Sequence, residues 1–125
     1  MGLRLGFVPD LARKIYAGAD LFLMPSKSEP CGLSQMVALR YGTLPIVRET
    51  GGLRDSITDS GDGEGNGFTF KTYDAYDMLG AIYRGIDAFN SKDYWKMLVE
   101  RALLCDMSWG KSANEYIKMY KSLLK

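Results

Sequence analysis

The sequence contains no histidine, and its 125 residues include only two cysteines, Cys31 and Cys105. Without histidine the chain cannot form a Ser-His-Asp triad, and two cysteines this far apart do not have the spacing of a zinc site. Residues 1–7 are too short and too polar to be the apolar part of a signal peptide. Few cysteines and no signal peptide indicate reduced thiols, so we expect a cytoplasmic protein.

A large excess of charge is also missing. The 16 Lys and Arg residues nearly balance the 15 Asp and Glu residues, which gives a formal charge of +1. The basic residues are scattered, so no surface for nucleic acid is indicated. No apolar run is long enough to cross a membrane. We therefore expect one globular domain, or a part of one, with no nucleic acid and no membrane as partners.

The centre of the chain has the order strand, loop, helix and strand. Residues 21–24 and 44–47 are short apolar runs, and a helix is expected between about residues 33 and 41. This order is typical of a βαβ unit with a parallel sheet, and the first run is apolar enough to be buried on both faces. Ligands of such sheets lie at the carboxyl ends of the strands. The loop over residues 25–33 lies at one of these ends.

The remaining elements follow from caps and spacing. We expect a strand end at residues 4–8, then a helix with Asp10 as its N-cap and Gly18 in the left-handed conformation after it. A last strand is expected at residues 67–70. Three helices with apolar residues at helical spacing should follow, and most of their aromatic side chains should belong to the core. Their expected N-caps are Asp74, Ser91 and Ser108.

Glu29 is the candidate for chemistry in the loop over residues 25–33. It could bind a sugar hydroxyl or stabilise positive charge at an anomeric carbon. Residue type alone favours a different role, in which Glu29 caps or neutralises the start of the following helix, since acids are common there. Cys31 has no histidine partner, which favours a thiol packed in the site over a nucleophile.

Two glycine-containing segments could bring backbone N–H groups to a phosphate. Residues 32–34 lie at the expected start of a helix, and residues 50–52 form a sharp turn after a strand. Both segments could also be ordinary turns, which use glycine routinely. The glycine-rich residues 60–67 do not form a calcium loop, because the ligand positions counted from Asp59 fall on Gly61, Gly63 and Phe70.

Together, several segments closely resemble bacterial glycogen synthase and plant starch synthase. They are IYAGAD (residues 15–20), MPS (24–26), EPCGLSQ (29–35), LRYGTLP (39–45), TGGL (50–53), GF (67–68) and SW (108–109). The resemblance implies a Rossmann-like parallel sheet ending in a helical segment, as part of the C-terminal domain of a GT-B glycosyltransferase. It implies transfer of glucose from ADP-glucose to the non-reducing end of an α-1,4-glucan, with retention and without a metal or other cofactor.

The resemblance also implies roles for individual residues. Glu29 would be the carboxylate at the transferred glucose, and Phe7 would stack on the adenine. The remaining donor-binding residues would lie at the phosphates and the sugar, and they are Cys31, Gly32, Leu33, Ser34, Thr50, Gly51 and Gly52. Residues 1–70 would form the nucleotide-sugar half-site and residues 71–125 the C-terminal helices of one partial domain.

Two departures from the family pattern matter. Related glycosyltransferases often have a second Glu eight positions after the first, where this chain has Val37; the glycogen synthase group shares this departure. The family's N-terminal domain and the first half of its C-terminal domain, with the basic residues that clamp the donor phosphates, have no counterpart here. We therefore expect the isolated chain to be inactive and to self-associate through an exposed strand edge or an exchanged helix.

Two other functions stay open at this point. The chain could belong to an enzyme of the same fold that uses another nucleotide sugar, although the EPCGL segment argues against it. It could also be an α/β interaction or scaffold module without catalytic activity, which would bind no nucleotide even when the upstream part of the family's domain is restored.

Overall fold

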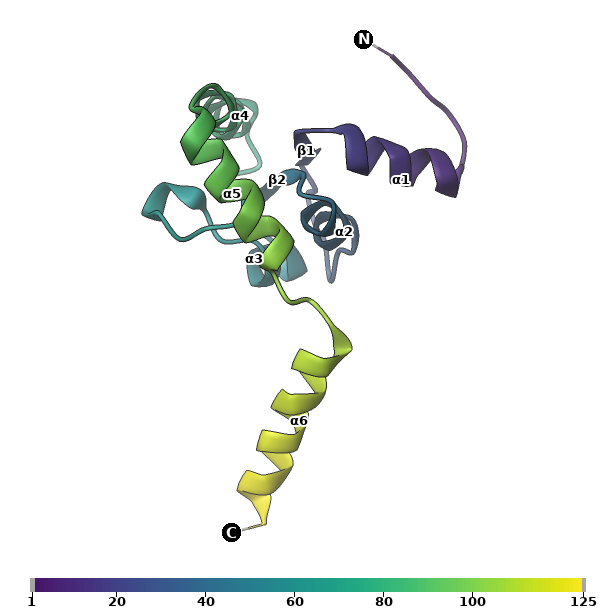
Figure 1. Cartoon of the computed structure of the whole chain (residues 1–125), viewed down its shortest axis with the longest axis vertical. Helices are drawn as coiled ribbons and strands as arrows, with labels where there is room; N and C mark the ends of the chain where they lie inside the picture. Colours follow the sequence, from purple (N-terminus) through teal and green to yellow (C-terminus); the bar gives the residue numbers. More distant parts are fainter. Residues whose placement is uncertain (1, 125) are drawn as a thin grey trace.

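The computed structural model describes residues 2–124 and shows a small parallel sheet surrounded by helices (Figure 1). The strands are β1 (Leu21–Met24), β2 (Leu44–Arg48) and β3 (Phe68–Phe70). The helices are α1 (Pro9–Gly18), α2 (Ser34–Arg40), α3 (Gly51–Ser56), α4 (Ala75–Asn90), α5 (Lys92–Leu104) and α6 (Trp109–Leu123), with a 3₁₀ turn at Ser60–Asp62. The expected order of elements is thus confirmed from β1 onward.

The sheet has the order β1-β2-β3, and both pairs of strands are parallel. Leu21 pairs with Leu44, and Ile46 pairs with Phe68, so the three strands end at the same edge. β2 is central and its first four residues are buried. The expectation that β1 is buried on both faces is wrong, because β1 is an edge strand and Leu23 is 42% exposed.

The core is formed by the central strand and the helices that pack on it. α4 packs on β2 and β3, α2 on β1 and β2, and α5 on β2, α2 and α4. Leu44, Ile46 and Leu98 are almost completely buried. α4 approaches the sheet closely at Gly85, where an added Cβ would lie 3.3 Å from the Leu21 side chain and 3.4 Å from Ile46.

The segment before β1 differs from the sequence predictions in three ways. Residues 2–8 form no strand, because no described strand lies beside them to pair with. The N-cap of α1 is Val8, while Asp10 lies in the first turn and forms an ion pair with Arg13 at 2.8 Å. Gly18 is the last helical residue and is not left-handed.

Thr43 explains why α1 can end without a left-handed residue. The Thr43 hydroxyl lies within hydrogen-bond distance of two backbone carbonyl oxygens at the end of the helix, those of Tyr16 and Ala19. Such contacts satisfy carbonyl groups that a glycine cap would otherwise pair. Because Thr43 is fully buried immediately before β2, this contact also fixes the end of α1 to the sheet.

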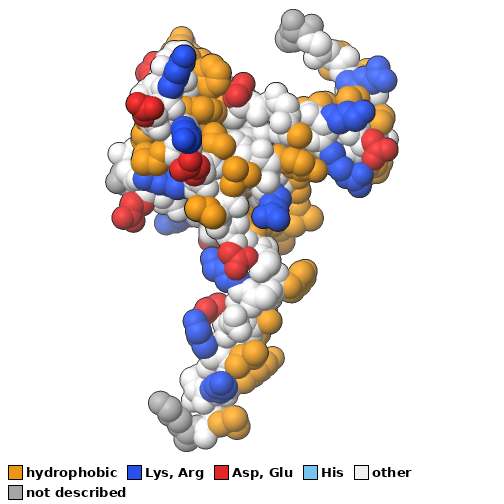
Figure 2. Space-filling model, viewed as in Figure 1, with side chains coloured by type: hydrophobic (Ala, Val, Ile, Leu, Met, Phe, Trp, Pro, Cys, Tyr) orange, Lys and Arg blue, Asp and Glu red, His pale blue; other side chains and the backbone are white. Residues whose placement is uncertain are grey.

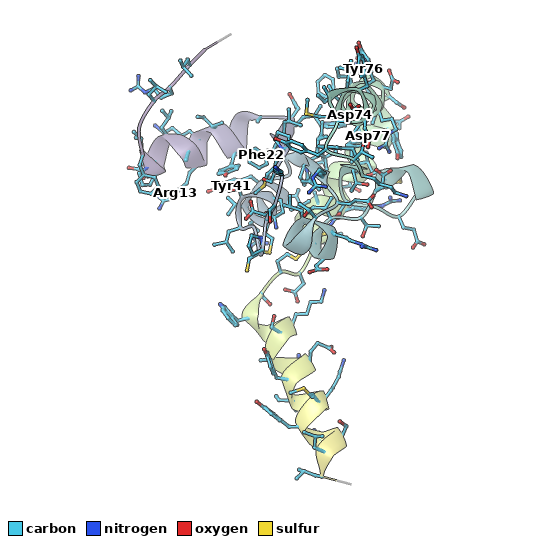
Figure 3. The ribbon with its side chains drawn as sticks, turned by 180° about the vertical axis from the view of Figure 1, so that it is seen from behind. Arg13, Phe22, Tyr41, Asp74, Tyr76 and Asp77 are labelled. Atoms are coloured by element: carbon cyan, nitrogen blue, oxygen red, sulfur yellow. The ribbon has the colours of Figure 1, made fainter. Side chains whose placement is uncertain are left out.

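The N-caps of the last three helices lie where the sequence predicts. Asp74 caps α4 through its side chain, which accepts hydrogen bonds from the N–H groups of Tyr76 and Asp77; Figure 3 shows these residues together at the start of α4. Ser91 and Ser108 occupy the N-cap positions of α5 and α6 without a side-chain hydrogen bond.

α6 is not part of the core. It has no buried residue, Trp109 is 86% exposed, and hydrophobic side chains are visible along the helix in Figure 2. The expectation that most aromatic side chains of the last three helices belong to the core is therefore wrong, since Tyr76, Tyr83 and Phe89 of α4 are exposed as well. Among the described residues, no helix is both long and apolar enough to span a membrane.

Candidate functional site

The two predicted loops meet at the carboxyl edge of the sheet. The loop over residues 25–33 follows β1, and the turn over residues 49–50 connects β2 to α3. The Gly52 N–H donates a hydrogen bond to the Glu29 carbonyl oxygen at 3.1 Å. Two loops that are distant in the chain are therefore joined backbone to backbone, as expected for the ends of neighbouring parallel strands.

Glycine is required at this junction because the two backbones touch. A Cβ added to Gly51 would lie 2.1 Å from the Glu29 carbonyl oxygen, and a Cβ added to Gly52 would lie 1.8 Å from the Cys31 carbonyl oxygen. Both distances are far below van der Waals contact. Gly51 also has a φ of +46°, which side chains disfavour. The Gly-Gly pair therefore allows a close approach that other residues would prevent.

The Glu29 side chain is half-buried in this loop, and its Oε2 accepts a hydrogen bond from Ser26 Oγ at 3.3 Å. It does not cap the next helix, since α2 has Leu33 as its N-cap and no side-chain hydrogen bond there. The capping interpretation of Glu29 is thus not supported. A carboxylate that can still accept hydrogen bonds at the edge of the sheet suits the binding of sugar hydroxyls.

The backbone N–H groups after β2 are mostly used within the protein. Thr50 N–H donates to the Arg48 carbonyl oxygen at 2.8 Å, Gly52 N–H donates to Glu29, and Leu53 N–H donates to Thr50 at 3.1 Å. The interpretation that this turn presents consecutive backbone donors to a ligand is therefore wrong for Thr50 and Gly52. A contact of Thr50 with a ligand would have to come from its hydroxyl group.

The predicted residues in the first loop lie together at the start of α2. Cys31 is exposed, Gly32 is buried with a φ of +72°, and Leu33 is 69% exposed. Ser34 is the first residue of α2. Their proposed contacts with a donor stay predictions.

Phe7 is not brought to the other predicted residues. It is 94% exposed in the segment that precedes α1, which Figure 1 shows beyond the end of α1 that is far from the sheet. Stacking of Phe7 on an adenine stays a prediction and would require residues 2–8 to move toward the Glu29 loop.

Sequence reasoning missed Arg48, the last residue of β2. Its Nε donates to the Ser26 carbonyl oxygen at 3.0 Å, its Nη2 to the Lys27 carbonyl oxygen, and its Nη1 to the Lys71 carbonyl oxygen at 3.4 Å. Its guanidinium also lies 5.8 Å from the centre of the Tyr73 ring. Arg48 thus ties the Glu29 loop to the segment after β3. Its place at the end of a buried central strand is the signal that could have identified it.

Gln35 was also missed as a contributor to the site, because it is part of a helix that reads as apolar. Its side chain is completely buried between the two loops. Its Nε2 donates to the Gly32 carbonyl oxygen at 2.9 Å and to Ser56 Oγ at 3.0 Å. Only a polar residue on the buried face of α2 could have indicated this contact.

Among the residues whose side chains the structure describes, no three His, Cys, Asp or Glu residues lie together in a way that could hold a metal ion. The expectation that the reaction needs no metal was made from the resemblance, and it stays a prediction.

The comparisons with known proteins agree with this architecture. The family model described as "Glycosyl transferases group 1" matches residues 4–96. The chain belongs to this glycosyl transferase family. Within it, the chain is 54% identical over 123 residues to a glycogen synthase of Bacillus cereus, covering 97% of this chain and 26% of that protein. A glycogen synthase of Geobacillus thermodenitrificans is 54% identical over 127 aligned residues, and the match covers 100% of this chain and 26% of that protein.

Solved structures of other glycosyltransferases have the same fold. The catalytic domain of starch synthase IV from Arabidopsis thaliana, bound to ADP and acarbose, superposes with a TM-score of 0.86 at 43% identity. The match covers 94% of this chain and 25% of that one. A sucrose-phosphate synthase from Thermosynechococcus elongatus superposes with a TM-score of 0.63 at 24% identity, which shows the fold alone. This glycosyl transferase chain thus spans about a quarter of the length of the relatives it matches.

Proposed function

We propose that this chain forms the nucleotide-sugar half-site of a retaining glucosyltransferase that uses ADP-glucose to extend an α-1,4-glucan. The observation that carries the proposal is the hydrogen bond from Gly52 N–H to the Glu29 carbonyl oxygen. This bond joins the backbone of the Glu29 loop to the glycine turn at one edge of the sheet, and ligands of open α/β sheets bind at such an edge.

The relatives support this choice of donor and acceptor. The matched bacterial proteins are glycogen synthases, and the matched plant domain was solved with bound ADP and acarbose. Because the chain spans about 26% of the bacterial proteins, glucan binding and glucose transfer are proposed for a longer protein of this kind. Reaction without a metal and a cytoplasmic location are parts of the same proposal.

In this proposal Glu29 binds hydroxyl groups of the transferred glucose, and its negative charge stabilises the positive charge that develops at the anomeric carbon. Residues 32–34 would contact the diphosphate. The isolated chain should transfer no detectable glucose, since transfer also requires a second wall of the site that excludes water and orients the glucan.

Calorimetric titrations test the proposal. We expect ADP and ADP-glucose to bind the chain and UDP to bind more weakly. The isosteric substitution Glu29→Gln should weaken binding of ADP-glucose but not of ADP, because only the former carries the sugar. Equal binding of UDP and ADP would favour another nucleotide sugar. No binding of any nucleotide would contradict a half-site in this chain, and a module without catalytic activity would be favoured if a longer protein with the upstream segment also bound none.

Phe7→Ala is a separate arm of the same titration. Weaker ADP binding by this variant would show that residues 2–8 reach the nucleotide. Unchanged ADP binding would contradict the stacking role of Phe7 and leave the role of Glu29 to be decided by the Glu29→Gln variant.

A further inference from the structure

Gln35 and Ser56 form a hydrogen-bonded link between the two loops of the site. Gln35 Nε2 donates to the Gly32 carbonyl oxygen at 2.9 Å and to Ser56 Oγ at 3.0 Å. Ser56 Oγ in turn donates to the Gly52 carbonyl oxygen at 2.6 Å. One side-chain amide and one hydroxyl thus connect the backbone after β1 with the backbone after β2.

We propose that Gln35 and Ser56 are positioning residues that hold the Glu29 loop and the glycine turn at the spacing that the donor requires. The inference rests on the proposed function of these loops. It concerns residues that touch neither the donor nor the acceptor in that proposal, and it assigns them an effect through the backbone of Gly32 and Gly52.

The link depends on the absence of a side chain at Gly32. A Cβ added there would lie 2.7 Å from Gln35 Oε1 and 2.9 Å from Gln35 Nε2. The Gln35 amide therefore occupies the space that a side chain at residue 32 would fill. This explains the glycine independently of its φ of +72°. The amide group and the loop backbone are packed as one unit.

Stability alone does not account for a glutamine at this position. Gln35 is 0% exposed, and its Oε1 has no hydrogen-bond partner among the residues whose side chains the structure describes. A buried carbonyl group without a partner is costly, and methionine would fill a similar volume without that oxygen. Residues that break a local rule in this way are expected at functional sites. The two hydrogen bonds from Nε2, which hold the loops together, offset this cost.

The alternative is that Gln35 only fills space between α2 and α3. Under that alternative, replacing Gln35 would either destabilise the whole protein evenly or have no effect on its stability. Under the positioning role, replacing it would loosen the junction of the loops in particular. The Gly52 N–H reports on this junction, since it donates to the Glu29 carbonyl oxygen.

Site-resolved amide hydrogen exchange of the full chain tests the proposal. In Gln35→Met, exchange of the Gly52 N–H should accelerate at least about tenfold more than exchange of core amides in α4. Ser56→Ala should act in the same direction. Because both residues belong to one link, their effects on exchange of the Gly52 N–H should not add. Ser56→Ala should accelerate this exchange less when it is introduced into Gln35→Met than when it is introduced into the unsubstituted chain.

Ala88→Gly in α4 is the matched control, because Ala88 is 5% exposed and lies outside the link. It should accelerate the Gly52 amide and the α4 amides by the same factor. Equal acceleration of both amide groups in Gln35→Met as well would overturn the positioning role.

An ADP titration separates this inference from the proposed function. If the unsubstituted chain binds ADP, Gln35→Met should raise its Kd by about tenfold while Ala88→Gly leaves it unchanged. An unchanged Kd in Gln35→Met would overturn the inference. If the unsubstituted chain binds no ADP, the proposed function of the chain is contradicted, whereas hydrogen exchange still decides whether Gln35 and Ser56 hold the loops together.

Discussion

α4 and α6 are helices of similar length with very different environments. α4 has 16 residues and buries Ala81, Gly85 and Ala88, whereas α6 has 15 residues and buries none. Both have apolar residues at helical spacing in the sequence. Apolar spacing therefore identifies a helix and its apolar face, but it does not identify the surface against which that face packs. We therefore expect substitutions in the body formed by the sheet, α4 and α5 to matter far more than substitutions in α6.

The largest difference should come from paired leucine truncations. Leu98 in α5 is 0% exposed and Leu123 in α6 is 73% exposed. Leu98→Ala removes buried methyl groups and leaves a cavity, so it should lower the free energy of unfolding by about 3 kcal/mol. Leu123→Ala should change it by less than about 0.5 kcal/mol. Urea denaturation measures both values, and similar losses would contradict the division between body and α6.

A second pair compares glycines that are crowded and open. A Cβ at Gly52 would lie 1.8 Å from the Cys31 carbonyl oxygen, whereas a Cβ at Gly80 in α4 would meet nothing within 4 Å. Gly52→Ala should therefore destabilise the protein by about 2 kcal/mol. Gly80→Ala should stabilise it by about 0.5 kcal/mol, because alanine favours the helix. Thermal unfolding compares the two, and a stable Gly52→Ala variant would show that the loops are not in contact.

The third prediction concerns Asp59, which connects the 3₁₀ turn to β3 and α4. Burial raises the pKa of its carboxyl group, but hydrogen bonds from the Arg84 guanidinium and from the N–H groups of Thr69 and Gly61 outweigh burial, so the pKa is lower than its usual value of 3.8. Asp59→Asn should cost about 1.5 kcal/mol at pH 7, because it removes charge-assisted hydrogen bonds.

The sign of the pH dependence follows from the lowered pKa. The contribution of Asp59 is complete well above pH 3.8 and is lost as the pH falls through the lower pKa of the folded chain. Carboxyl groups of this kind titrate between about pH 4 and about pH 2. Over this range the free energy of unfolding should thus decline less steeply in Asp59→Asn than in the unsubstituted chain. Asp87→Asn on the exposed part of α4 is the control. Parallel pH profiles of the Asp59→Asn variant and the unsubstituted chain would refute this role.

The smallest effect is expected for the ion pair of α6. Lys118 Nζ lies 2.7 Å from Glu115 Oε1, and both side chains are largely exposed. A hydrogen bond from Lys118 lowers the pKa of Glu115. Because water and salt screen such exposed pairs, Glu115→Gln should leave the urea midpoint unchanged. A measurable shift would indicate that α6 contributes to the cooperative unit.

The self-association expected from the sequence depends on the surfaces that α6 and β1 leave exposed. α6 exposes Trp109, Tyr116 and Tyr120, and β1 is an edge strand. Exposed apolar faces and strand edges favour association between copies. Light scattering at micromolar concentration should therefore detect species larger than a monomer, and a clean monomer would contradict this prediction.

The sequence predicted the parts of the fold in which local signals and burial agree. The apolar runs of β1 and β2, the cap at Asp74 and the parallel order were all readable, since each depends on residues close in the chain. The strand at residues 4–8 was wrong, because a strand also requires a neighbour. The cap at Gly18 was wrong, because Thr43, which is distant in sequence, binds the last carbonyl groups of α1.

The location of the candidate site could be predicted from the sequence, but the side-chain contacts that hold its loops in place could not. Strand ends with glycine and a carboxylate indicated the edge of the sheet where residues 29–34 and 50–52 meet. The roles of Arg48 and Gln35 could not be predicted, because they depend on which carbonyl groups come within reach after folding. A polar residue in an otherwise apolar helix is the only local trace of Gln35.

A map of amide chemical shifts recorded while ADP is added to the chain would show where the nucleotide binds. We expect shift changes to concentrate at residues 32–34 and 50–52, at the edge of the sheet, while the amides of α6 do not change. Changes confined to α6, or no change at saturating ADP, would contradict the claim that the junction of these two loops is a nucleotide-sugar half-site.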